Sequence, residues 1–385
     1  MIEPHPLANK RILFALCGFD LGGAERQALY LAKYLKGVGA DVRVWGHHHE
    51  FHGPERVIVE CEAAGIPWAE YKFRWPSGKK QLFHDLLHLL LGLYRERPDI
   101  ILPYLPWLSI GCGLIWRLSP AKACIWGQRN AEDLNGDKLE RFAYRQATAI
   151  ICNAGHEIDY LRKVMGETDT PAHVIYNGVD LATPLKTRKQ WRVALKIDAK
   201  AIVVSMVANF RPQKDHRTLL IAWQQLLERH REVSTPVLVL AGAPQESYRG
   251  IRNISRELGL EESVRFPGQV EDVAGLLEAS DIGVLITDYE GLPNAILEYM
   301  TCGLPVVATD VPGNREALGE DSGKQFCKVK NAEDLADKLF SLISSPELRF
   351  RLGSRNRQRA ITEFSIETMC SRMTEILVGT LKKKA

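Results

Sequence analysis

Two glutamates, Glu290 and Glu298, stand on either side of a segment that is typical of a loop leading into a helix. Glu290 follows the apolar run 282–287, and Pro293 suits a first helical turn, where its missing N–H removes no hydrogen bond. The amides of residues 292–296 are expected to be unbonded and to form an anion site before the helix. The arrangement predicts a phosphorylated ligand at these amides, with one carboxylate at its reactive end and one at its hydroxyl-rich end. The alternative is a helix with an acidic start and a solvated second glutamate.

The residues that follow favour a ligand site. Gly303-Leu304-Pro305 leads into the apolar strand 306–308, which completes a strand–turn–helix–strand unit of an open parallel sheet. Glu-Gly-Leu-Pro-Asn, then Glu298 eight residues after Glu290, then Cys-Gly-Leu-Pro-Val-Val-Ala-Thr-Asp, resembles the Glu-x7-Glu signature of retaining glycosyltransferases of family 4. The resemblance implies an α/β protein of GT-B architecture, with two Rossmann-like doubly wound parallel-sheet domains that face a cleft.

Length and composition are consistent with two soluble domains. The chain has 385 residues, 45% hydrophobic, which is enough for two cores. A net charge of +3 is too small to indicate nucleic acid, but it suits anionic small molecules or an anionic membrane surface. Eight cysteines without a CxxC pair are typical of reduced, buried thiols. We find no secretory signal in residues 1–11 and no apolar run of the ~18–20 residues that a membrane span needs. We therefore expect a cytoplasmic protein, free or peripheral at the inner face of the cell membrane.

Strands and helices alternate in two series along the chain. The first is expected to have strands at 11–17, 41–45, 100–102, 123–126, 149–152 and 173–176, with helices at 24–37, 81–97, 138–147 and 157–165. The second is expected to have strands at 201–208, 236–241, 264–266, 281–286 and 305–308. The predicted domains are therefore 1–182 and 183–362. The resemblance implies that the first binds the acceptor and the second the nucleotide sugar. A last helical segment, 363–385, crosses back onto the first domain in the proteins that the chain resembles.

The loop after the first strand of the second domain carries two cations, Arg211 and Lys214. Fixed cations stabilise the negative charge that develops on a departing diphosphate, so both are candidate catalytic residues. The family pattern has an arginine five residues before the lysine, where this chain has Asn209, so Arg211 would act from a shifted position. Solvated loop charges are the alternative.

The resemblance also assigns roles in donor binding. Glu290 would orient the donor sugar and support positive charge at its anomeric carbon, and Glu298 would hold the ribose. Gln269 stands in the loop that lies against the nucleotide base in the family. Four residues of the turn between the glutamates would also line the donor site: Gly291, Leu292, Pro293 and Asn294.

In the first domain, Gly22 and Gly23 follow the first strand and precede a helix. Glycines let a backbone approach a phosphate closely, although Gly-Gly before a helix is equally common as a purely structural feature. The longer run Leu-Gly-Gly-Ala-Glu-Arg-Gln, which includes Glu25, resembles the family loop that lies against the donor diphosphate and the acceptor. Many relatives have a histidine near the transferred sugar where this chain has Arg129 and Asn130, so these two would contact sugar or acceptor.

No metal or cofactor is expected. His47, His48, His49 and His52 lie close together, but consecutive residues do not all face one ion without a tailored loop. A metal-bridging Asp-x-Asp is absent from the sequence, which fits a transferase that uses basic residues instead.

Basic and aromatic residues in 72–80 precede a helix with a stripe of apolar residues: Leu82, Phe83, Leu86, Leu89, Leu90 and Leu93. Such a stripe is more often the core face of a crossover helix than a membrane-docking surface. If it docks on an anionic membrane, a lipid-linked acceptor is expected.

The sequence thus predicts a retaining, metal-independent hexosyltransferase. It would move a sugar from a nucleoside diphosphate to a glycan or lipid-linked saccharide in bacterial-type surface polysaccharide or glycoconjugate biosynthesis. The alternatives are a nucleotide-sugar epimerase or phosphorylase of the same architecture, and a sugar-binding relative that has lost catalysis.

Overall fold

The structure, a computed structural model, describes residues 4–46, 55–71, 73, 78–129, 134–180, 183–229 and 236–382. The chain forms two compact units. The first comprises Met1–Gly178 with Ile366–Ala385, and the second comprises Val179–Ser365. The units therefore divide at 178/179 and 365/366, a few residues from the boundaries expected at 182/183 and 362/363.

The first unit is built on a seven-stranded sheet in the order β3-β2-β1-β4-β5-β6-β7, in which every neighbouring pair is parallel. Buried parallel strands need apolar residues on both faces, and β5 is buried along its whole length. The strands are β1 (Arg11–Ala15), β2 (Asp41–Gly46), β3 (Trp68–Glu70), β4 (Ile100–Pro103), β5 (Ala123–Gln128), β6 (Ala149–Cys152) and β7 (Ala172–Val174).

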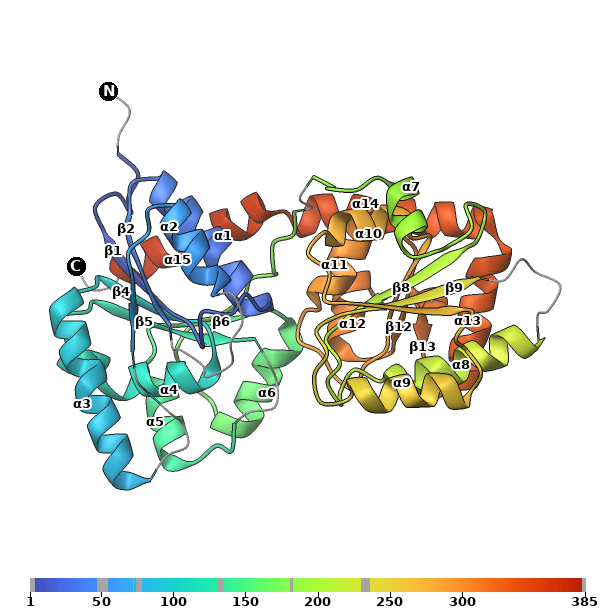
Figure 1. Cartoon of the computed structure of the whole chain (residues 1–385). Coiled ribbons are helices and arrows are strands. Elements are labelled where there is room, and N and C mark those ends of the chain that lie inside the picture. The colour runs from blue at the N-terminus through green and yellow to red at the C-terminus, as the bar shows by residue number, and fades with distance from the viewer. Residues whose placement is uncertain are drawn as a thin grey trace. The chain divides into compact units, whose positions relative to one another are not determined.

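The helices of this unit form two layers, one on each face of the sheet (Figure 1). Right-handed crossovers place the helices that precede β2 and β3 on one face, and those that precede β4 to β7 on the other. The first layer is α1 (Gly23–Gly37) and α2 (Arg56–Ala63). The second layer is α3 (Lys79–Glu96), α4 (Pro106–Ile115) with the 3-10 turn η1 (Trp116–Leu118), α5 (Lys138–Gln146) and α6 (Gly155–Met165).

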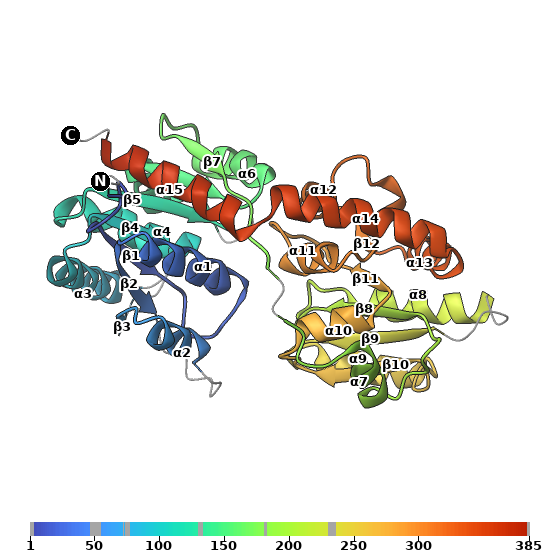
Figure 2. The same cartoon turned by 90° about the horizontal axis from the view of Figure 1, so that it is seen from above.

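The last helix, α15 (Ile366–Lys382), belongs to the first unit and completes its first layer. Its buried residues Met369, Met373 and Leu377 join the core that Ile125 and Ile151 form on this face of the sheet. Helix α15 runs beside α1, as two views show (Figures 1 and 2). Without it, half of one apolar sheet face would have no helix against it.

The second unit repeats the plan with a six-stranded parallel sheet in the order β10-β9-β8-β11-β12-β13. Its strands are β8 (Val203–Val207), β9 (Val237–Ala241), β10 (Val264–Gly268), β11 (Ile282–Leu285), β12 (Val306–Thr309) and β13 (Phe326–Cys327). Its helices are α7 (Arg188–Ala194), α8 (His216–Arg229), α9 (Tyr248–Glu257), α10 (Val273–Ala279), α11 (Asn294–Thr301), α12 (Pro312–Leu318), α13 (Ala332–Ser344) and α14 (Pro346–Glu363), with the 3-10 turn η2 (Gly323–Gln325).

The sequence reasoning missed the outermost strands β3 and β13, which have three and two residues. It also expected Phe83 on the core face of α3, but this side chain is 72% exposed. Six of the eight cysteines are buried, and Cys17 and Cys302 are half-buried. Among the described residues, no helix is both long and apolar enough to cross a membrane.

Candidate active site

Two loops of the second unit are joined at the carboxyl edge of its sheet. The Asp215 amide donates to the Ile286 carbonyl at 2.9 Å, and the Asp288 amide donates to the Gln213 carbonyl at 3.0 Å. These bonds form a short antiparallel bridge between the segment after β8 and the segment after β11. Because β8 and β11 are neighbours in the sheet, the bridge extends their contact beyond the strand ends.

The bridge brings Lys214 and Glu290 together. The Lys214 ammonium forms an ion pair and hydrogen bond with Glu290 Oε1, across 76 positions of sequence. The two side chains are 18% and 15% exposed, so both are largely withdrawn from water but not fully buried. Charges in such a place interact more strongly with each other and with a ligand than fully solvated charges do. The pair is the strongest feature of this edge of the sheet.

A second lysine, Lys330 between β13 and α13, supports the bridge from the other side. Its ammonium lies 3.1 Å from Asp215 Oδ2 and 2.7 Å from Asp288 Oδ1. Burial alone would raise the pKa of Asp215, but the hydroxyl and amide of Thr218, followed by Lys330, hold it below its ordinary value. Burial would lower the pKa of Lys330, but the two carboxylates raise it instead. Lys330 thus connects the loops that carry Lys214 and Glu290.

Arg211 lies on the same loop as Lys214 but has a different partner. Its Nε donates to the side-chain carbonyl of Gln245 at 2.8 Å, and the residue is exposed. Asn209, at the position where the family pattern has arginine, accepts a hydrogen bond from the Ala243 amide at 3.1 Å. Both contacts lead towards the loop after β9. The structure therefore brings Lys214, and not Arg211, to Glu290.

Helix α11 begins at Asn294, one residue later than the position predicted for Pro293 in the first turn, and Pro293 is its N-cap. The expectation of unbonded amides over 292–296 is wrong for Ile296, whose N–H donates to the Pro293 carbonyl at 3.1 Å. Leu292 is 4% exposed and Glu298, in the second turn, is 8% exposed. The predicted donor-binding residues Gly291, Leu292, Pro293 and Asn294 thus form a compact turn between the two glutamates.

This turn and α11 are held against the sheet by close packing. The Tyr299 hydroxyl accepts from the Val207 amide at 2.7 Å and donates to the Val284 carbonyl at 3.3 Å, at the ends of β8 and β11. A Cβ at Gly313, in the first turn of α12, would overlap the Gly291 carbonyl, so only glycine allows α12 to approach the turn. Gln269 is exposed directly after β10, beyond Gly268, which has a φ of +78°.

In the first unit, Gly22 is the N-cap of α1 and Gly23 is its first residue. A Cβ at Gly22 would overlap the Glu25 carboxylate, which turns back over the start of the helix. Burial raises the pKa of Glu25, and the Asp20 charge adds to the rise, while the backbone amide of Gly22 and Arg129 act against it. A carboxylate therefore lies where the glycines were predicted to receive a phosphate.

Arg129, directly after β5, is fixed by two contacts within the first unit. Its Nη1 donates to Asn177 Oδ1 at 2.9 Å, and its guanidinium lies 4.3 Å from the centre of the Tyr104 ring. Asn177 and Tyr104 are buried and follow β7 and β4, so the carboxyl ends of three strands position this cation. Asn130, which was predicted with Arg129 to contact sugar or acceptor, lies outside the described residues.

In the ranges of the chain given above, no group of three or more histidine, cysteine, aspartate or glutamate side chains could hold a metal ion. The candidate cluster His47, His48, His49 and His52 lies outside those ranges.

Sequence reasoning did not select as site residues four residues that the structure places around the predicted ones: Tyr104, Asn177, Asp215 and Lys330. Asp215 follows Lys214 directly and precedes a helix, which is a recognisable cap position. Lys330 lies in the run Lys-Val-Lys-Asn, which carries no motif, and only the folded sheet brings it to the bridge.

Two family models match the chain. Residues 21–183 match Glycosyltransferase Family 4, and residues 187–359 match Glycosyl transferases group 1. The chain is similar to the crystal structure of HepE from Anabaena in complex with UDP and glucose, with a TM-score of 0.81 and 20% identity over 96% of this chain and 100% of the other. The chain is a family 4-like glycosyltransferase of the GT-B fold. The Glu-x7-Glu signature and the roles of its two glutamates stay predictions.

Curated relatives of this glycosyltransferase differ in the acceptors that their names state. The chain is 24% identical to the N-acetyl-alpha-D-glucosaminyl L-malate synthase of Bacillus anthracis, over 77% of this chain and 75% of the relative. It is 22% identical to the UDP-Gal:alpha-D-GlcNAc-diphosphoundecaprenol alpha-1,3-galactosyltransferase of Escherichia coli, over 64% of each chain.

Proposed function

We propose that this glycosyltransferase moves a hexose-type sugar from a nucleoside diphosphate sugar to a saccharide or lipid-linked saccharide, with retention at the anomeric carbon and without a metal ion. The observation that carries the proposal is the ion pair of Lys214 and Glu290 at adjoining strand ends of the second unit. The relatives' names support activated sugars as donors and glycoconjugates as products. The reaction would take place in the cytoplasm, in glycoconjugate biosynthesis and at the membrane surface where the acceptor is lipid-linked.

Each member of the pair has a role that follows from its charge. As the bond from the anomeric carbon to the diphosphate breaks, the bonding electrons move to the diphosphate, and the Lys214 ammonium stabilises them. The carboxylate of Glu290 stabilises the positive charge that remains on the sugar. The acceptor hydroxyl then bonds to the anomeric carbon, and its proton passes to the departing phosphate oxygen. Arg211, at the rim of the same loop, adds positive charge near the diphosphate, and Glu298 and Gln269 hold the nucleoside.

Donor binding is the direct test. We expect one nucleoside diphosphate sugar among UDP and GDP donors to raise the melting temperature of the second unit, because a ligand that binds only the folded state stabilises it. Lys214→Ala should lower the affinity for that donor about 10- to 100-fold, which is the contribution of one charge-assisted hydrogen bond. Lys324→Ala removes the same charge from an exposed position in the same unit and should leave binding unchanged.

Turnover separates the roles. Glu290→Gln should bind the donor within a few-fold of wild type but lose both transfer and donor hydrolysis. The anomeric configuration of the wild-type product, followed by NMR, tests retention. Wild-type turnover in this variant would exclude the role given to Glu290. An epimerised donor or a sugar phosphate formed without acceptor would instead identify an epimerase or phosphorylase. Activity that survives EDTA would support a metal-independent reaction.

A further inference from the structure

Helix α3 of the first unit has one face against the sheet and another that carries apolar side chains into solvent. Asp85, Leu89 and Leu93 are buried, and Leu82, Leu86 and Leu90 pack at the margin of the same core. The opposite face carries four large exposed side chains, whose exposed fractions are 72% for Phe83, 45% for Leu87, 57% for Leu91 and 54% for Tyr94.

These four residues form a continuous apolar stripe. Their spacing of four, four and three positions keeps them on one side of an α-helix. From Phe83 to Tyr94 the helix rises by eleven steps of 1.5 Å, which gives the stripe a length of about 16 Å. Isolated exposed apolar residues are common on protein surfaces, but a line of four along one helix is a surface that can bury a substantial area against a partner.

The exposed charges that α3 itself carries at its two ends are all of one sign. Lys79 and Lys80 stand in the first turn of α3, and Arg95 and Arg97 at its end; all four are exposed. The two carboxylates of the helix are withdrawn from this surface. Asp85 is 3% exposed and accepts a hydrogen bond from Gln81. Glu96 is 18% exposed and lies 3.8 Å from Arg43.

Lys79 and Lys80 are unfavourable for the stability of the helix that carries them. The N-terminal end of a helix has a partial positive charge, which favours acidic residues and disfavours basic ones. The first turn of α3 nevertheless has Lys79 and Lys80 and no acidic residue. Helix stability therefore does not account for these lysines, whereas attraction to an external anionic surface does.

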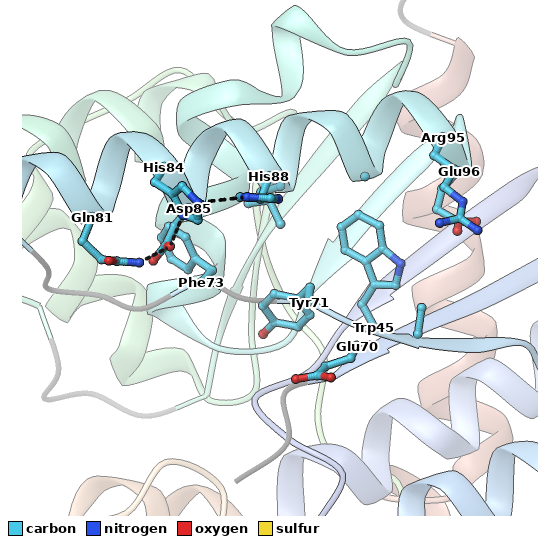
Figure 3. Close-up of a pocket in the computed structure, with 13 residues that line it drawn as sticks. Trp45, Glu70, Tyr71, Phe73, Gln81, His84, Asp85, His88, Arg95 and Glu96 are labelled. Carbon is cyan, nitrogen blue, oxygen red and sulfur yellow. Dashed lines mark hydrogen bonds and ion pairs between the residues drawn. The ribbon is translucent and has the colours of Figure 1, made fainter.

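One flank of α3, next to the stripe, borders a groove of about 840 Å³ (Figure 3). His84, His88 and Arg95 of the helix line it, facing Trp45 and Tyr71 at the edge of the sheet. His84 and His88 contact each other at 3.0 Å between their Nε2 atoms. The stripe is thus bordered on this flank by imidazole and guanidinium groups of α3, with the exposed Glu70 of β3 across the groove. Polar groups beside an apolar line suit the boundary between acyl chains and headgroups.

We propose that α3 docks on an anionic lipid bilayer. The helix lies in the plane of the surface, with Phe83, Leu87, Leu91 and Tyr94 among the upper acyl chains and the lysines and arginines on the headgroup phosphates. A second copy of the same face is disfavoured as the occupant, because the exposed charges of α3 are cations at both ends of the stripe and would repel those of the second copy. The inference deepens the membrane contact of the proposed function. It is tested without turnover, so its failure would leave the donor chemistry standing.

The first test is sedimentation of the full chain with sucrose-loaded vesicles. We expect binding to phosphatidylglycerol vesicles, little binding to phosphatidylcholine vesicles, and weaker binding as salt rises. Phe83→Ser with Leu91→Ser should reduce the partition coefficient at least about tenfold, because two partly exposed apolar side chains no longer enter the bilayer. Phe350→Ser with Ile361→Ser on α14 removes side chains of matching exposure, 78% and 57%, and should bind like wild type.

The second test reverses the charge at the start of the helix. Lys79→Glu with Lys80→Glu should abolish binding to phosphatidylglycerol vesicles while leaving the first unit at least as stable, because acidic residues suit a helix N-terminus. Unchanged binding in either α3 variant, or no binding of the wild-type chain, would overturn the proposal. A third outcome would also overturn it: the wild-type chain forms an oligomer by light scattering, does not bind vesicles, and becomes monomeric when Phe83 and Leu91 are changed. The stripe would then be a protein interface.

Discussion

His216, the first residue of α8, makes the second unit sensitive to acid. Its ring is 1% exposed, stacks on Phe210 with 4.4 Å between ring centres, and places Nδ1 2.7 Å from the Lys214 carbonyl. Nε2 is buried and has no hydrogen-bond partner among the residues that the structure describes. Burial lowers the pKa of His216 from its ordinary 6.5 to about 4, and the nearby Lys214 charge opposes protonation as well. The folded unit therefore holds a neutral imidazole at pH values where the unfolded chain holds a charged one.

The magnitude follows from the two pKa values. Between about pH 6.5 and about pH 4, the unfolded chain binds a proton that the folded chain does not, so stability falls as pH falls through this window. From pH 7.5 to pH 5 the loss due to this one group is about 2 kcal/mol, from a shift of about 1.36 kcal/mol per pKa unit. His216→Phe preserves the stacking on Phe210 but does not titrate. It should be less stable than wild type at pH 7.5 by about 1 kcal/mol, for the hydrogen bond lost at the Lys214 carbonyl.

The variant should therefore approach or exceed wild-type stability at pH 5. The assay is urea unfolding at both pH values, followed by pulsed hydrogen exchange on peptides from α8, which report the second unit alone. The difference between wild type and His216→Phe should change by about 2 kcal/mol in favour of the variant on going from pH 7.5 to pH 5. A difference that is the same at both pH values would show that His216 takes up its proton as readily in the folded chain as in the unfolded chain, and would refute the reasoning.

Two further predictions concern backbone positions. Lys330 has a φ of +58°, in the left-handed region, which alanine would have to keep. Lys330→Ala also loses the contacts with Asp215 and Asp288. Because Lys330 is more than half exposed, we expect this variant to lower the free energy of unfolding by about 1 kcal/mol. Lys330→Gly loses the same contacts but relieves the strain, and should recover about 0.5–1 kcal/mol in urea unfolding; equal losses in the two variants would contradict the strain. A Cβ at Gly178 would lie 2.8 Å from the Ile366 Cα, so Gly178→Ala should destabilise the first unit by about 1–3 kcal/mol. An unchanged unfolding midpoint for peptides from α15 would show that the helix can shift at no cost.

Strand and helix periodicity predicted the fold because buried parallel strands carry continuous apolar runs that stand out in a sequence. The runs that became β8, β11 and β12 were identified on this basis. β3 and β13 were not predicted because their three and two residues carry no apolar run. β7 is an edge strand as short as β3, but Val174, Ile175 and Tyr176 continue its apolar pattern past the strand end, so a strand was predicted there. Phe83 was assigned to the wrong face of α3 because the helix has apolar residues on more than half of its circumference, and periodicity alone does not select the side that meets the sheet.

The candidate site was predicted less completely, for a physical reason. Lys214 and Glu290 come from separate loops, and each follows an apolar strand, so the topology alone predicts that they meet. Lys330 and Asn177 act through contacts with residues that are 115 and 48 positions away. Lys330 stands in no motif, and the Asn-Gly pair at Asn177 is typical of a turn, so neither sequence context points to the contact. Arg211 was placed by analogy with a pattern that the chain does not match at Asn209, and its contact with Gln245 reflects that difference.

The position of α15 has a consequence for synthesis of the protein. Residues 11–178, with all seven strands of the first sheet, emerge from the ribosome long before residues 366–382 do. In that interval the apolar face around Ile125 and Ile151 has no helix to cover it, and the second unit can fold first, although it is made second. Nascent chains of this protein are therefore expected to need protection from aggregation until α15 has left the ribosome, and a chain truncated before α15 should be a substrate for chaperones and proteases.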